Sequence, residues 1–160
     1  EKWRLEMDNN GYETLNKIRT ALYGENTLVP LDDENLISVI LTYPAAKVAA
    51  IDGKVDETER LFLLNISEEL GIEDPGTSHK ARLEAAERYR AFMWLLNEQE
   101  SFEKIIFDGI KILVQENIDI GEKITNMLWG IAESSEDVSE SEVKEISRIT
   151  EALGISNTLN

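Results

Sequence analysis

Apolar residues recur along most of the chain at intervals of three and four, the spacing of one face of an α-helix. No sustained alternation of apolar and polar residues, typical of strands, is present. The spacing predicts helices over residues 12–23, from 32 or 33 toward 52, over 56–71, from 77 or 78 to about 96, over 101–116, from 119 onward, and over 139–154. We therefore expect an all-α fold, a compact bundle of about seven helices.

Glycine and proline mark several predicted boundaries. Gly24 ends the first helix, and residues 73–76 (Glu-Asp-Pro-Gly) form the clearest loop. Pro44 falls inside the second helix, which it should kink or split into two pieces. We assign residues 1–31 to an N-terminal helix and linker, and residues 32–160 to the domain into which they lead.

The chain contains an internal repeat. Residues 44–72 and 127–155 align without a gap at an offset of 83 residues, with identities at the start, in the middle and at the end. The identical positions are Ala49/Ala132, Val55/Val138, Glu57/Glu140, Glu59/Glu142, Ile66/Ile149, Glu68/Glu151, and Leu70-Gly71-Ile72 against Leu153-Gly154-Ile155. Each copy reads as a helix, a short acidic loop, a second helix and a glycine that stops it.

Both copies carry residues that begin and end a helix. Asp56 and Ser139 are the expected N-caps, and Glu59 and Glu142, three residues later, complete a capping box with them. The glycine that ends each copy suits the left-handed conformation after a helix, and the isoleucine behind it should fold back onto that helix.

The two copies differ in how much of each helix is apolar. Residues 56–71 are apolar nearly all round and should form the central helix. The last helix of the second copy carries Lys144, Glu145 and Arg148 on its outer side, and this face should meet water. The helix that enters the first copy is rich in small residues, which allow a neighbouring helix to approach closely: Ala45, Ala46, Ala49 and Ala50. The helix that enters the second copy instead carries the large side chains of Leu128, Trp129 and Ile131. Trp94 and Trp129 should anchor the core.

Composition excludes several classes of protein. A chain of 160 residues is the size of one domain and can bury a core without disulfides or metals. No apolar run approaches the roughly 18 residues that span a bilayer, so we expect a soluble chain with no membrane insertion. The net charge of −16 repels nucleic acid and accumulates cations, so we expect no nucleic-acid partner.

The usual components of a catalytic site are missing. There is no cysteine, and the single histidine, His79, leaves no second imidazole for a metal site. The phosphate-binding patterns GxGxxG and GxxxxGK[ST] and a nucleophile elbow do not occur. We expect a protein that is not an enzyme.

Residues 48–59, Val-Ala-Ala-Ile-Asp-Gly-Lys-Val-Asp-Glu-Thr-Glu, resemble the signature of the TerB-like (tellurite resistance) family. A second, similar motif near the end of the domain, another feature of the family, corresponds here to residues 131–155. The resemblance implies a bundle of about seven helices, a link to tellurite or other chemical stress, and a divalent-cation site in the acidic loops. It equally implies an adaptor role, because the module also heads membrane-anchored DnaJ-type co-chaperones.

The second copy departs from the family pattern. Ser135-Glu136 stands in place of Asp-Gly, and Ser139 in place of an aspartate, which argues against an ion site there. We interpret its carboxylates as an acidic, solvated loop: Glu133, Glu136, Asp137, Glu140 and Glu142.

The candidate metal ligands lie in the first copy. Asp52, Asp56, Glu57 and Glu59 crowd carboxylate oxygens onto a glycine-containing loop, and such oxygens are the ligands of Ca²⁺ and Mg²⁺. The spacing is not that of an EF-hand loop. In the alternative interpretation the same residues form a capping box and favour the positive end of the helix dipole. Both interpretations stand on the sequence.

We therefore predict a non-catalytic, TerB-like stress-response module that binds a divalent cation, Ca²⁺ or Mg²⁺, at the first acidic loop. The alternative is an acidic adaptor without an ion site, which docks a protein partner with a basic surface. We expect a cytoplasmic location. The chain starts at Glu1 rather than at methionine, which indicates trimming upstream and leaves a secreted or periplasmic location open.

Overall fold

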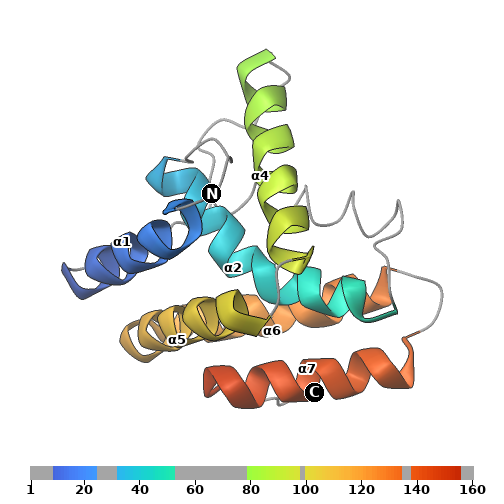
Figure 1. Cartoon of the computed structure of the whole chain (residues 1–160). Helices are drawn as coiled ribbons and strands as arrows, with labels where there is room; N and C mark the ends of the chain where they lie inside the picture. Colours follow the sequence, from blue (N-terminus) through green and yellow to red (C-terminus); the bar gives the residue numbers. More distant parts are fainter. Residues whose placement is uncertain (1–8, 25–31, 53–78, 98–99, 135–137, 156–160) are drawn as a thin grey trace.

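The computed structural model describes residues 9–24, 32–52, 79–97, 100–134 and 138–155. Their regular structure is entirely helical, which confirms the all-α prediction (Figure 1). The elements are α1 (Asn9–Tyr23), α2 (Asp33–Ala49), the 3-10 turn η1 (Ala50–Asp52), α4 (His79–Asn97), α5 (Glu100–Glu116), α6 (Ile118–Glu133) and α7 (Glu140–Leu153). Each α-helix matches a predicted helix to within a few residues at every end that was predicted, and η1 falls in the last turn of the second predicted helix. The predicted helix over residues 56–71 lies outside the described ranges.

Helix α2 occupies the central position among the described elements. It contacts α1, α4, α5, α6 and α7, and 13 of its 17 residues are buried. Its most extensive contact is with α6, the helix that matches it in the repeat. Ala45, Ala46 and Ala49 are all buried, as the prediction of a closely approaching neighbour requires.

Pro44 does not split this helix. Helix α2 continues from Asp33 to Ala49 with the proline inside it. A proline in a helix interior costs roughly 3 kcal/mol, because it removes one backbone hydrogen bond and crowds the preceding turn. The apolar side chains buried around Pro44 outweigh that cost, so tertiary packing overrides the local preference.

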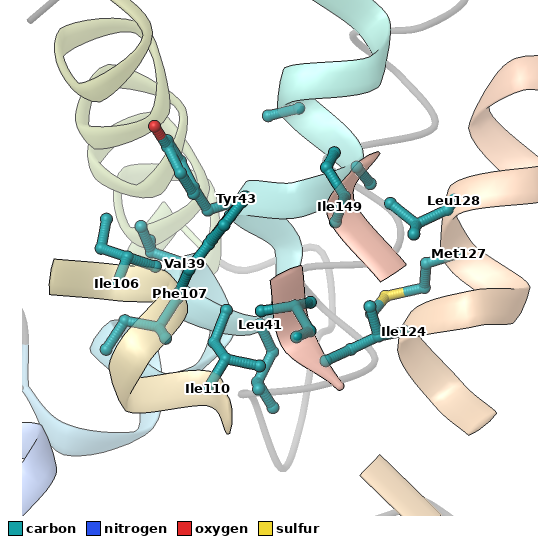
Figure 2. Packing of buried hydrophobic residues seen from close by; sticks show 14 of the residues in the cluster. Val39, Leu41, Tyr43, Ile106, Phe107, Ile110, Ile124, Met127, Leu128 and Ile149 are labelled. Atoms are coloured by element: carbon teal, nitrogen blue, oxygen red, sulfur yellow. The ribbon is translucent and has the colours of Figure 1, made fainter. Parts of the chain in front are cut away.

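The core lies between α2, α5, α6 and α7, and Figure 2 shows side chains from these four helices meeting there. Tyr43 of α2 and Phe107 of α5 meet edge to face, with ring centroids 6.1 Å apart. Trp94 and Trp129, predicted as core anchors, are partly buried and pack against this core. Helix α1 approaches α5 closely at Gly109, where a Cβ atom would lie 2.6 Å from Cδ1 of Ile18.

The C-terminal end of α7 has the predicted conformation. Gly154 adopts a φ of 70°, in the left-handed region that favours glycine. The amide of Gly154 donates to the carbonyl of Glu151 (3.1 Å), and the amide of Ile155 donates to that of Thr150 (2.9 Å). This pair of bonds is the Schellman arrangement, and Ile155 packs back against the core.

Candidate functional site

The first acidic loop begins at the edge of the described structure. Asp52 is the last residue of η1, whereas Asp56, Glu57 and Glu59 lie outside the described residues. Within the described ranges, no group of three or more histidine, aspartate or glutamate side chains could hold a metal ion. The four-residue ligand set therefore stays a prediction.

The described residues that flank the two acidic loops lie at one end of the molecule. The turn that ends at Asp52 contacts α7. Figure 1 shows the end of η1, the end of α6 and the start of α7 at the same end of the bundle. Glu133 closes α6 and Glu140 opens α7, and both residues are exposed. We call Asp52, Glu133 and Glu140 the loop-end carboxylates.

The start of α7, which follows the second acidic loop, shows the role of two glutamates of the repeated motif. The Ser139 amide donates to Oε1 of Glu142 (2.9 Å), and the Glu142 amide donates to Oγ of Ser139 (3.1 Å), so the predicted capping box is present. The Glu142 side chain is buried, which corrects its assignment to a solvated loop. To accept the bond from the Ser139 amide, the Glu142 side chain must fold back over the first turn of α7, and this position buries it. Glu140 points outward and pairs with Lys144 at 3.3 Å.

The repeat relates these roles to the first copy. At the offset of 83 residues, Glu140 corresponds to Glu57 and Glu142 to Glu59. In the second copy the two carboxylates do not converge on a common point, because one caps its helix and the other lies in a surface ion pair. This observation favours the capping interpretation of the motif over the ligand interpretation.

A network of charges that the sequence analysis missed joins three helices. Arg148 of α7 bonds to Glu145 of its own helix and donates through Nη2 to Oε1 of Glu103 in α5 at 2.7 Å. Lys47 of α2 lies 3.5 Å from the same Glu103 oxygen. The guanidinium also lies over the ring of Phe107, 6.0 Å from its centroid.

The prediction that Glu145 faces water was wrong, although Lys144 and Arg148 are exposed as expected. Glu145 is only 7% exposed. The helical period placed these three residues on one outer side, but α7 packs against α5, and the guanidinium of Arg148 covers the carboxylate. A buried carboxylate is tolerated when a cation pairs with it in this way.

The charges and the burial in this network shift the pKa values of Glu103, Arg148 and the neighbouring Tyr43. Partial burial raises the pKa of Glu103, but bonds and charge from Arg148, together with Lys47, outweigh this effect and lower the pKa below its usual value. Bonds to Glu145 and Glu103 raise the pKa of Arg148. Burial, followed by the negative charge of Glu103, raises the pKa of Tyr43. The shifts of Glu103 and Arg148 favour the charged forms that make up the network, and the shift of Tyr43 favours its neutral hydroxyl.

A second polar contact, also missed, lies between α2 and α4. Arg88 is fully buried and donates through Nη1 to Oδ1 of Asn35 at 2.6 Å. Asn35 in turn donates through its backbone and side-chain nitrogens to Oδ1 of Asp32, the N-cap of α2, each at 2.9 Å. The available signal was the three-four spacing of Arg88, Ala91 and Leu95, which puts the arginine on the inner face of α4.

Two of the hollows on the described surface are each lined by a single helix. One is lined by Asp119, Glu122, Lys123 and Asn126 on α6, the other by Glu13, Asn16, Lys17 and Thr20 on α1. Each lining set comes from one face of one helix and combines at least one carboxylate with a lysine. Among the helices that are described, none is long and apolar enough to cross a membrane.

Comparisons of the chain with protein-family models, with curated proteins and with solved structures give no match.

Proposed function

We propose that the chain is a non-catalytic, TerB-like stress-response module that works as an acidic adaptor and docks a basic segment of a protein partner. The observation that carries this proposal is that basic residues of the chain pair with its own carboxylates. In the described part of the chain, at least six of them form ion pairs with the chain's own carboxylates: Arg19, Lys47, Arg90, Lys104, Lys144 and Arg148. With 32 acidic and 16 basic residues, this pairing leaves a large acidic surplus to face outward.

The loop-end carboxylates are the proposed docking position. In the sequence, two further acids, Glu136 and Asp137, stand between Glu133 and Glu140. A comparable set, Glu116, Asp119 and Glu122, is exposed around the other end of α6. Because α6 has 16 residues, the two ends of the helix lie about 24 Å apart.

This separation provides a matched test. One triple variant, D52N/E133Q/E140Q, removes three negative charges at the loop end, and the control variant, E116Q/D119N/E122Q, removes three at the opposite end. The probe is a lysine- and arginine-rich helical peptide, and the measurement is its Kd at several salt concentrations. We expect the loop-end variant to bind about tenfold more weakly, equivalent to about 1.4 kcal/mol, and the control to bind less than about threefold more weakly.

Equal losses in the two variants would assign the binding to the diffuse charge of the whole chain and overturn the docking position. Peptide binding that does not weaken between about 0.05 and 0.5 M salt would overturn the electrostatic adaptor itself, since exposed charges are screened at high salt.

A divalent-cation site at the first acidic loop is the second candidate function. The observation in its favour is the contact between η1 and α7, which puts Asp52 at the end of the bundle where the second acidic loop begins. The proposed ligands are Asp52, Asp56, Glu57 and Glu59, and the ion is Ca²⁺ or Mg²⁺.

Thermal unfolding with each ion at physiological salt separates this candidate from the adaptor. An ion at a hundred times its Kd adds about 2.7 kcal/mol, which raises the Tm by roughly 5–10 °C for a chain of this size. Asp52→Asn should abolish the increase, and Asp119→Asn, which removes the same charge at the distant end of α6, should preserve it. An absent increase, or one that both variants retain, would overturn the site and leave the adaptor as the function.

A further inference from the structure

We draw no further inference here: the strongest candidate, the 85% exposed Ile118 beside the acidic hollow on the first turns of α6, is a lone apolar side chain in a cluster of carboxylates, and nothing in the structure shows what covers it.

Discussion

Helix α2 is held by different polar contacts in its two halves. Near its start, Asn35 accepts a hydrogen bond from Arg88, which is fully buried between α2 and α4. Near its end, Lys47 joins the network of Glu103 and Arg148, in which the arginine side chain remains 46% exposed. The contact of Arg88 with Asn35 is buried away from water, whereas the network of Lys47, Glu103 and Arg148 is partly exposed and shares several charges.

This difference determines what each contact contributes. Water cannot reach Arg88. If Asn35 is lost as its acceptor, the buried guanidinium therefore keeps an unsatisfied hydrogen-bond donor. Water and salt can reach Arg148, so that the loss of one partner there is largely compensated. The buried contact therefore fixes how α4 sits on α2, while the exposed network adds a smaller, tunable attraction between α2, α5 and α7.

The largest predicted effect follows from removing the acceptor in the buried contact. Asn35→Leu keeps a side chain of similar size but leaves Arg88 without this bond. We expect the free energy of unfolding, measured by urea titration, to fall by about 3 kcal/mol, the upper part of the range for an unsatisfied buried group.

The double variant N35L/R88M sharpens this prediction. Replacing both partners by apolar side chains removes the stranded donor, and such replacements are often close to neutral. We expect the double variant to be more stable than Asn35→Leu alone. If the free energy of unfolding of N35L/R88M fell by the sum of the decreases in Asn35→Leu and Arg88→Met, the two side chains would contribute independently and the prediction would be wrong.

A smaller effect is expected at the other end of α2. Arg148→Met should lower the free energy of unfolding by about 1 kcal/mol at 0.1 M salt, because water reaches the Glu145 carboxylate once the guanidinium that covers it is gone, and a partly exposed network contributes little more than a surface pair. At 1 M salt, where the Debye length falls to about 3 Å, most of this loss should disappear. The decrease in the free energy of unfolding caused by Asn35→Leu should be the same at both salt concentrations.

Lys144→Met is the matched control for the exposed network. Its partner is Glu140, and the two side chains are 76% and 85% exposed. We expect a change within about 0.5 kcal/mol at either salt concentration. If the loss in Arg148→Met were as large as that in Asn35→Leu and equally insensitive to salt, the distinction between a buried and a partly exposed contact would be wrong.

The same distinction explains what could be predicted from the sequence. The cap at Ser139, its partner Glu142 and the stop at Gly154 are formed by residues a few positions apart, so their spacing alone predicted them. Asn35 and Arg88 are 53 positions apart, and Glu103 and Arg148 are 45 apart. No local pattern specifies which helix faces supply such partners.

The candidate site shows a second limit. Asp56 and Glu59 carry the same oxygen atoms whether they cap a helix or bind an ion, so their spacing is compatible with both roles. In the second copy the position of Glu142 distinguishes the two, because its carboxylate bonds to the Ser139 amide. The exposure of Glu145 was mispredicted for a related reason, since packing of α7 against α5 overrode the local pattern. Of the two outcomes expected at Pro44, a kink or a split, the split does not occur, because α2 continues through the proline.

The smallest effect, and the most specific to the exposed network, is a dependence on pH. The pKa of Glu103 in the folded chain lies below its ordinary value of 4.5, because Arg148 and Lys47 outweigh the opposing effect of burial. The unfolded chain therefore takes up this proton first as the pH falls. The stability that the ionised Glu103 contributes is fully present above about pH 5 and is lost as the pH falls through 4.5 toward the folded value.

Glu103→Gln removes this titration. The difference in free energy of unfolding between the parent chain and Glu103→Gln should be constant from about pH 7 to 5.5 and should shrink below pH 4.5, as measured by urea titration at each pH. In an Arg148→Met background the shrinkage should be weaker, because the main cause of the lowered pKa is gone. A difference that stays constant down to pH 3 would mean that Glu103 titrates alike in the folded and unfolded chains. The network would then hold no net preference for the ionised carboxylate, and apolar packing rather than the charge of Glu103 would join its three helices.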